Sequence, residues 1–457
     1  MFCRDRQVNT VSSPLPRFDG TYQRLRREAL DQAALIVHLV RWICLGALSG
    51  VLAGGSSWVF LEVLDRITRF RVSHDWIVVL LPIAGLVIGL VYHYLGGRSG
   101  EGNALLIDEI HEPLAWVPRR MAPLVMFGTW ATQLFGGSAG REGTAIQMSG
   151  SLTDGLSRIL HLDRDDRRLM LIAALAGGFG AVFGVPLAGA VFGLEVQSIG
   201  RVRYEALVPA LTASIVGDLV VSGLGYHHPA LPQLAVHLSA ALAGKVAVAG
   251  LVFGLAGAAF VELTHAIRHF MTRRVTWPPL RLVIGGIGIV ALAGLFGQEY
   301  LGLSLPLVGR ALAGEHLSFA VFALKILFTA VTLGCAFPGG EVTPLFVVGA
   351  TLGSALAGPL GLPVPLLAAV GFVAVFAGAA NVPLACTIMG VELFGSAAVV
   401  PFAVGCVVAY VFSNHRGIYP TQRIHAAKGG DPINGRPTLQ HWRHRQRGNG
   451  SGKREAD

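Results

Sequence analysis

The segment GVPLAGAVFGLE at residues 184–195 returns, with the same spacing, as NVPLACTIMGVE at residues 381–392. In both copies the motif Val-Pro-Leu-Ala is followed, nine residues after the proline, by a glutamate, which is Glu195 in the first copy and Glu392 in the second. Both stretches are apolar and interrupted by Gly and Pro. At membrane depth such segments are tolerated where the loosened backbone is buried in protein or lines a cavity.

A related pair of motifs lies upstream of these two segments. GREGT occupies residues 140–144 and GEVT occupies residues 340–343, so that the Glu–Thr elements are 199 residues apart and the proline elements 197. Two elements that recur in the same order at nearly one offset indicate an internal duplication. The alternative is chance similarity among Gly- and Ala-rich helices.

Composition places the chain in a membrane. Of its 457 residues 53% are hydrophobic and only 14% are charged, and the mean hydropathy is +0.59. A soluble domain carries about 25% charged residues. The 59 glycines suit the close helix contacts that replace the hydrophobic effect in lipid. We therefore expect an all-α, polytopic membrane protein.

The apolar stretches fall into two classes, each of which includes segments from both halves of the chain. Uninterrupted spans, long enough to cross the hydrocarbon core, are expected at 32–63, 76–96, 204–224, 238–262, 280–297, 318–337 and 397–413. Stretches broken by Gly and Pro lie at 121–137, 144–160, 168–198, 343–360 and 364–396. Broken helices in corresponding positions of two halves indicate a transport site at their interface.

The net charge of +9 is concentrated in a few places. Arginines cluster near both ends of the chain and in two short loops, residues 158–168 and 268–281. By the positive-inside rule both termini should be cytoplasmic. We expect an N-terminal segment, two membrane repeats and a basic tail of disordered composition, bounded as 1–31, 32–225, 236–420 and 421–457.

Several other classes of protein are disfavoured. The five cysteines form no CxxC pair, and the fifteen histidines show no ligand spacing, so neither a metal nor another cofactor is expected. The basic tail lacks the aromatic platform of a nucleic-acid binder. GGSAG at residues 136–140 fits the G-x-S-x-G pattern of serine hydrolases, but that serine requires a strand-to-helix turn. Here it lies in an apolar helical region, and we expect no enzyme.

The Gly-rich segments can form an anion site. A helix that begins inside the membrane directs unpaired N–H groups and the positive end of its dipole at the preceding loop. Several such ends make an anion site without a full positive charge. The candidate helix starts lie at residues 100–103, 140–144 and 338–344, and Thr144 and Thr343 add hydroxyl donors.

Glu142 is the residue that we expect to gate this site. Its carboxylate is itself an anion that can occupy the site when ionised and leave it when protonated, which would couple anion passage to proton passage. The alternative is a structural ion pair with the adjacent Arg141. For Glu195 and Glu392 two interpretations stay open, a functional role or an interior polar contact between helices.

These residues carry a resemblance to a known family. GREGT at residues 140–144 resembles the GREGP motif of the CLC chloride channels and transporters, and residues 184–189 resemble its N-A-P-L-A-G segment, whose Asn the second copy restores at Asn381. GEVTP at residues 340–344 stands in the place of the family's GxFxP, and Tyr419 where the family has an anion-coordinating tyrosine. The likeness runs from about residue 35 to 425.

The resemblance implies the CLC architecture: two inverted-topology repeats of tilted and broken helices, a pore in each subunit and a homodimer in the cell (inner) membrane. It implies that Glu142 is the gating and proton-coupling residue. The anion-binding residues that it implies are Asn103, Gly140, Arg141, Gly143, Thr144, Val342, Thr343 and Tyr419.

Departures from the family pattern narrow the function. The serine of the family's first motif is missing from residues 100–106, where Asn103 is the nearest polar candidate, and this change together with GREGT and GEVTP is similar to the fluoride-exporting branch of CLC antiporters. The second glutamate of the exchangers falls at Val196, so Glu341 is the candidate stand-in. We expect a fluoride/proton antiporter; a chloride/proton exchanger and a passive anion channel are the alternatives.

Overall fold

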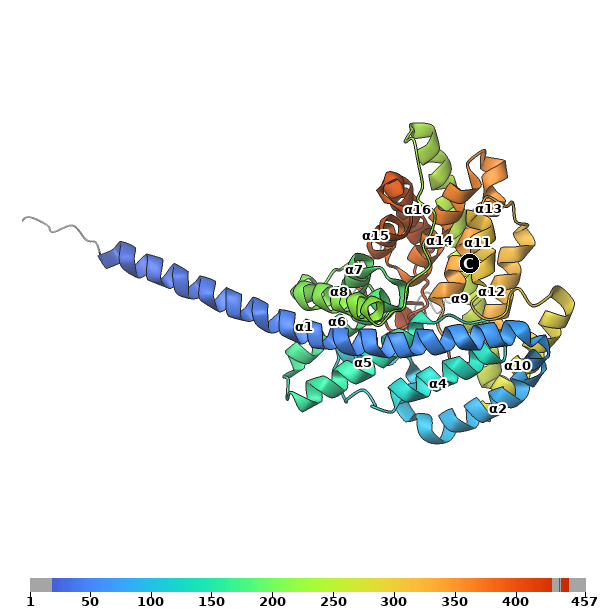
Figure 1. Cartoon of the computed structure of the whole chain (residues 1–457), viewed down its shortest axis with the longest axis horizontal. Coiled ribbons are helices and arrows are strands. Elements are labelled where there is room, and N and C mark those ends of the chain that lie inside the picture. Colours follow the sequence, from blue (N-terminus) through green and yellow to red (C-terminus); the bar gives the residue numbers. More distant parts are fainter. Residues whose placement is uncertain (1–18, 430–434, 436, 444–457) are drawn as a thin grey trace, which may run out of the picture.

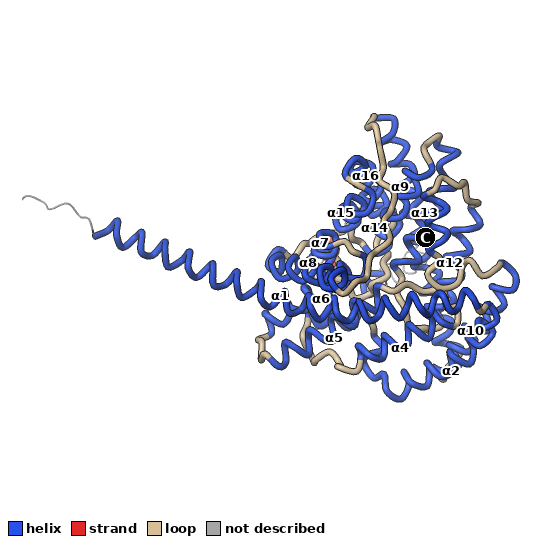
Figure 2. The backbone as a smooth tube through the Cα atoms, in the orientation of Figure 1, coloured by secondary structure: helices blue, strands red, loops and turns tan. Residues whose placement is uncertain are grey.

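The computed structural model describes residues 19–429, 435 and 437–443, and most of this part of the chain is helical (Figure 2). The first half contains α1 (Asp19–Ser73), α2 (Leu81–Val91), α3 (Asn103–His111), α4 (Met121–Leu134), α5 (Glu142–Ile159), α6 (Arg164–Phe183), α7 (Pro186–Glu195) and α8 (Leu207–Gly223). The second half contains α9 (Ala240–Arg274), α10 (Pro278–Phe296), α11 (Leu305–Leu312), α12 (Phe319–Gly334), α13 (Val342–Leu360), α14 (Val364–Ala380), α15 (Pro383–Phe394) and α16 (Val399–Phe412). Short helical turns are η1 (Asp75–Leu80), η2 (Tyr92–Gly96), η3 (Gly97–Glu101), η4 (Tyr204–Ala206) and η5 (Ser396–Ala398), and two strands are β1 (Ser198–Ile199) and β2 (Arg423–Ile424).

The predicted all-α membrane fold is confirmed. Six helical segments of the described chain are long and apolar enough to cross a bilayer. The longest, Leu30–Ser73, belongs to α1, whose N-terminal part projects from the helical body (Figure 1). In contrast, α6, α13 and α14 are buried along most of their length and form the centre of the molecule. Residues 1–18 of the predicted N-terminal segment lie outside the described part.

Two of the stretches expected to be broken by Gly and Pro, 168–198 and 364–396, are broken, whereas 121–137, 144–160 and 343–360 each hold one continuous helix, α4, α5 and α13. Helix α6 ends at Gly184 and α14 ends at Asn381, both in the left-handed conformation, with φ of 70° and 61°. Pro186 and Pro383 then occupy the first positions of α7 and α15, where a missing N–H costs nothing. These two turns lie 197 residues apart, as the motif spacing indicates.

Glu195 and Glu392 connect the two halves reciprocally. The carboxylate of Glu195 accepts hydrogen bonds from the backbone N–H groups of Leu384 and Ala385, at 3.1 and 2.9 Å. The carboxylate of Glu392 accepts from those of Leu187 and Ala188, both at 2.8 Å. Each glutamate therefore satisfies unpaired donors in the first turn of the other's helix. This geometry matches the interior polar contact, which was one of the two interpretations of these residues.

The upstream motifs correspond differently from what their letters indicate. Gly140 and Gly340 form an antiparallel bridge in which each N–H donates to the other's carbonyl, at 2.7 and 3.0 Å. The helices that follow begin at Glu142 and Val342, so the structural offset is 200 residues and not 199. Matching the Glu–Thr letters pairs Glu142 with Glu341. The bridge between the backbones instead pairs Glu142 with Val342, one residue further along the chain.

Part of the C-terminal tail is ordered, which corrects the prediction of disorder for that part. Strand β2 pairs in parallel with β1, and the side chain of Gln422 donates to the carbonyls of Val196 and Ala380 at 2.6 and 2.9 Å. Ile424 and Leu439 are buried together with Ile199. The prediction of disorder rested on the overall composition of the tail, which does not reveal these few apolar and amide contacts. The rest of the tail, residues 430–434, 436 and 444–457, lies outside the described chain.

Candidate functional site

The carboxylate of Glu142 lies at the N-terminus of α13. Its Oε1 accepts from the N–H of Val342 at 2.6 Å, and its Oε2 accepts from the N–H and hydroxyl of Thr343 at 3.2 and 2.8 Å. The N–H of Arg141 also donates to Oε2, at 2.9 Å. The group is fully buried, so these donors and the dipole of α13 replace its hydration.

The two bridged glycines provide the space for this carboxylate. A Cβ at Gly340 would lie 1.9 Å from Oε1 of Glu142, and a Cβ at Gly140 would lie 2.5 Å from Oε2. Real Cβ atoms do not approach so closely. The cradle is therefore built from both repeats, and the missing side chains at residues 140 and 340 let a charged oxygen reach the backbone donors.

The alternative of an ion pair between Glu142 and the guanidinium of Arg141 does not hold in the structure. The side chain of Arg141 lies over the ring of Phe183, with 5.7 Å between the guanidinium carbon and the ring centroid. Only its backbone N–H contacts the carboxylate. The hydroxyl of Thr144 also lies apart, because it shares a hydrogen bond of 2.6 Å with Thr129 on α4.

Asn103 approaches the site from a third helix. It is the first residue of α3, and its Nδ2 would lie 3.3 Å from a Cβ at Gly143. Its Oδ1 is buried without a hydrogen-bond partner in the described chain. Since amide oxygen and nitrogen are assigned from their surroundings, a side chain with an unpaired end is free to turn its donors toward a bound anion.

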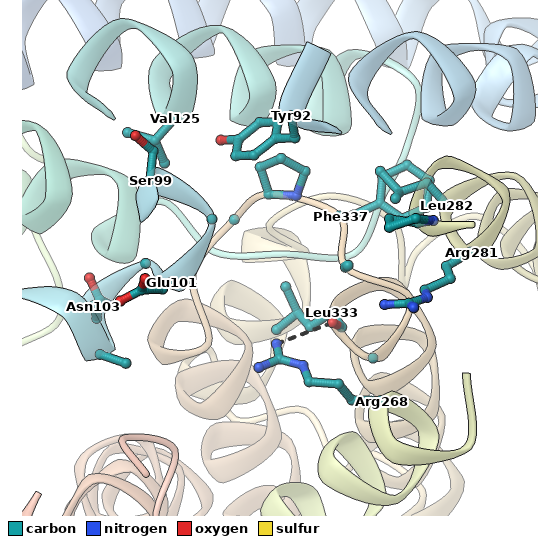
Figure 3. Close-up of a pocket in the computed structure, with 18 of the residues that line it drawn as sticks. Tyr92, Ser99, Glu101, Asn103, Val125, Arg268, Arg281, Leu282, Leu333 and Phe337 are labelled. Atoms are coloured by element: carbon teal, nitrogen blue, oxygen red, sulfur yellow. Dashed lines mark hydrogen bonds between the residues drawn. The ribbon is translucent and has the colours of Figure 1, made fainter. Parts of the chain in front are cut away.

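A cavity of about 540 Å³ lies beside the cradle (Figure 3). Its wall includes Asn103, Glu341 and Tyr419, so three of the predicted site residues meet there. In Figure 3 Asn103 and Glu101 face the cavity from one side, whereas Arg268 and Arg281 face it from the other. Glu341 is the residue before α13 and takes its N-cap position. It lies in the same loop as the cradle but faces the cavity.

The basic wall of this cavity is the feature that sequence reasoning missed. Arg268, near the end of α9, donates to the carbonyl of Leu333 at 3.3 Å, and Arg281, on α10, donates to that of Val275 at 2.8 Å. Both arginines belong to the basic loop that indicated membrane topology. No motif in the sequence indicates that these two arginines line the cavity beside the cradle. Gln147, five residues after Glu142, was also missed although it is polar within an apolar helix.

Behind the cradle lies a buried lysine, Lys325. Its Nζ lies 2.8 to 3.1 Å from four oxygens, which are Ser138 Oγ, Tyr300 O, Gly302 O and Ser304 Oγ. Ser138 also shares a hydrogen bond with Thr329 at 3.0 Å. The serine of the G-x-S-x-G pattern thus anchors the loop that precedes Glu142, and in the described chain it does not sit on a strand-to-helix elbow.

Comparisons with known proteins agree with this geometry. Residues 84–414 match the model of the family described as voltage gated chloride channel. A chloride/fluoride channel protein of Pseudomonas syringae is 44% identical over 91% of this chain and 93% of its own length. An H(+)/Cl(-) exchange transporter of Vibrio parahaemolyticus is 26% identical over 83% of this chain and 86% of its own.

Solved structures give the same result for the fold. The structure of a CLC-type fluoride/proton antiporter superposes with a TM-score of 0.82 at 34% identity, covering 84% of this chain and 98% of its own. A cyanobacterial Cl-/H+ antiporter superposes with a TM-score of 0.69 at 19% identity, covering 82% and 93%. The predicted CLC-like fold is confirmed. The chain belongs to the voltage gated chloride channel family, the CLC family that its motifs resemble.

Proposed function

We propose that this protein exchanges fluoride for protons across the membrane and thereby exports fluoride. The observation that carries the proposal is the cradle of Glu142, in which a carboxylate accepts from three hydrogen-bond donors at the start of α13 and from the N–H of Arg141 before α5. A small anion needs the same donors. The carboxylate and the anion therefore compete for one site, and protonation of Glu142 decides the competition.

Glu341 is the proposed second proton carrier. It lies in the wall of the cavity together with Arg268 and Tyr419. A proton that enters through this cavity would meet Glu341 one residue before Val342, whose N–H holds Glu142. This short path supports a proton relay from Glu341 to Glu142. Such a relay does not need the second glutamate of the exchangers, whose position is occupied here by Val196.

Fluoride, as the substrate, is supported by the kind of donors at hand. Fluoride is small and strongly hydrated, so its site must offer strong donors in place of water. The hydroxyl of Thr343 already donates to an anion, the amide nitrogen of Asn103 lies 3.3 Å from where a Cβ at Gly143 would be, and the phenol of Tyr419 lines the cavity. The relatives whose names include fluoride support the same choice.

The test is an efflux assay on proteoliposomes loaded with fluoride or chloride, with pH recorded at the same time. We expect fluoride efflux to exceed chloride efflux and to drive protons in the opposite direction. Equal fluxes with proton coupling would identify a chloride/proton exchanger. Fluxes without any proton movement would identify a passive anion channel.

The proposed topology places the protein in the inner membrane with both termini in the cytoplasm, and its two repeats at 32–225 and 236–420. Contacts between basic segments support it: the tail residue Arg443 shares a pocket with Arg273 and Arg274 at the end of α9. Likewise, Arg168 of the basic loop at 158–168 donates to the carbonyl of His111 at 3.3 Å, and the next residue, Glu112, forms an ion pair of 2.7 Å with Arg423 of the tail. Segments rich in arginine thus gather on one side.

A homodimer completes the proposal. The reciprocal capping by Glu195 and Glu392 holds α7 beside α15 and leaves Leu187 and Leu384, at equivalent positions, 51% and 52% exposed. A second copy would cover this paired apolar surface. Single cysteines at these two positions should cross-link in lipid; recovery of monomers alone would contradict the dimer.

A further inference from the structure

A second cavity, which adjoins the one beside the cradle, lies between the end of α9 and the C-terminal tail. Its volume is about 750 Å³. One wall is formed by the last three turns of α9, and the opposite wall by Gly417, Pro420, Leu439, Gln440 and Arg443. The ordered part of the tail therefore closes a cavity that α9 alone would leave as an open surface.

The lining of this cavity has an excess of positive charge. Four arginines contribute to it, Arg268, Arg273, Arg274 and Arg443, against one carboxylate, Glu262. Counting these described lining residues gives 4 − 1 = +3. The carboxylate is moreover engaged by two guanidiniums, those of Arg416 and Arg443. Because Glu262 pairs with these two arginines, it does not neutralise the charges of Arg273 and Arg274.

The two arginines at the end of α9 are exposed, and the ion pairs of the described chain do not include them. Arg274 lies over the ring of Phe270, 5.8 Å from its centroid. The fork of N–H donors on each guanidinium fits the several oxygens of a phosphate, which can bind more than one of them at once.

Apolar groups at the rim indicate where the phosphate comes from. Phe270 is 58% exposed and lines the cavity, and Trp277, three residues after the end of α9 but not in the lining, is 44% exposed. Aromatic side chains gather at the boundary between membrane and water. A basic cavity at this depth is suited to the head group of an anionic lipid.

We propose that this cavity binds the phosphate of an anionic phospholipid from the cytoplasmic leaflet. Arg273, Arg274 and Arg443 hold the phosphate, and Phe270 packs against the part of the lipid next to it. Arg268 and Thr272 line both this cavity and the cavity beside the cradle. The bound lipid therefore lies next to the entrance of the anion pathway.

The experiment is native mass spectrometry of the full-length protein titrated with phosphatidylglycerol, with phosphatidylcholine and with inorganic phosphate. We expect phosphatidylglycerol to bind more tightly than the other two. The double substitution Arg273→Gln/Arg274→Gln should weaken its binding by about tenfold or more, since each basic side chain near an anionic lipid contributes about a factor of five. Arg273→Lys/Arg274→Lys should restore part of this loss.

The matched control is Arg158→Gln/Arg164→Gln, which removes two exposed arginines from another basic loop. It should leave phosphatidylglycerol binding unchanged. Equal weakening by both double substitutions would overturn the proposal, because it would mean that only net charge matters. If inorganic phosphate binds as tightly as the lipid, with the same dependence on Arg273 and Arg274, the cavity is a site for free phosphate and the proposal of a phospholipid is wrong. None of these outcomes depends on whether fluoride is the substrate.

Discussion

Glu142 is held by groups that do not distinguish a carboxylate from another small anion: three backbone N–H groups and one hydroxyl. Glu142→Gln keeps the size of the side chain and removes its charge, so it should abolish proton movement. Anion movement should become uncoupled, or stop if the amide cannot leave the cradle. Fluoride-driven proton flux is the measurement, and proton pumping that survives the substitution would contradict the proposed coupling.

Gly140 offers a second test because the atoms nearest to a Cβ there would be those of the Glu142 carboxylate, at 2.5 to 2.9 Å. Gly140→Ala should displace this group and open the site while the fold is kept. A hydrogen bond to a charged group contributes about 1.5–3 kcal/mol, so the loss of one should raise uncoupled fluoride efflux by roughly tenfold. Gly155→Ala, on α5, is the control, because a Cβ there would make only an ordinary contact with Arg119, at 3.8 Å. Unchanged coupling in Gly140→Ala would show that the carboxylate does not need this space.

Asn103 tests selectivity. Serine at this position has one donor where the amide has two, and it is shorter, so Asn103→Ser should weaken fluoride binding more than chloride binding. We expect the ratio of fluoride to chloride efflux to fall by roughly tenfold, the equivalent of about one hydrogen bond. An unchanged ratio would place the origin of selectivity at Thr343 and Tyr419 instead.

At the scale of elements, the two prolines of the repeated motif predict helix starts correctly, whereas the repeated Glu–Thr letters do not predict which residues correspond. Pro186 and Pro383 begin helices as expected, because proline acts through its own backbone. The Glu–Thr letters at residues 142–144 and 341–343 misplace the equivalence by one residue, because correspondence there depends on a bridge between Gly140 and Gly340. The position of Arg268 in the cavity wall depends on tertiary folding in the same way.

The ordered tail makes its own prediction through Lys428. The ammonium donates to Asn381 Oδ1, Tyr410 O and Ser413 Oγ at 2.5, 2.7 and 2.9 Å. Burial lowers the pKa of Lys428 from 10.5 to about 7. Between these values the undocked tail binds more protons than the docked tail, so docking should strengthen as pH rises above about 7. Below pH 7 both states are protonated, and docking should not change further through this group.

The rate at which a protease cleaves the tail measures this docking. In the wild type the rate, corrected for the enzyme's own pH dependence, should fall between pH 7 and 9. Lys428→Met has no titrating group at this position and should lose that slope. A slope equal in both proteins would assign the pH dependence to another group, such as His415, whose Nε2 accepts from the N–H of Lys428.

At the scale of the whole molecule, the cradle draws on both repeats of one chain, since Gly140 and Glu142 come from the first and Gly340, Val342 and Thr343 from the second. The residues that line the cavity beside it likewise come from both repeats. Each subunit of the proposed dimer should therefore transport independently. Dimers that pair a wild-type subunit with a Glu142→Gln subunit, isolated through two different affinity tags, should show about half the fluoride-driven proton flux of wild-type dimers. The matched controls are doubly tagged wild-type and doubly substituted dimers. If one substituted subunit silences both, the pathway must cross the dimer interface, and the reciprocal glutamates on α7 and α15 would be the first residues to examine.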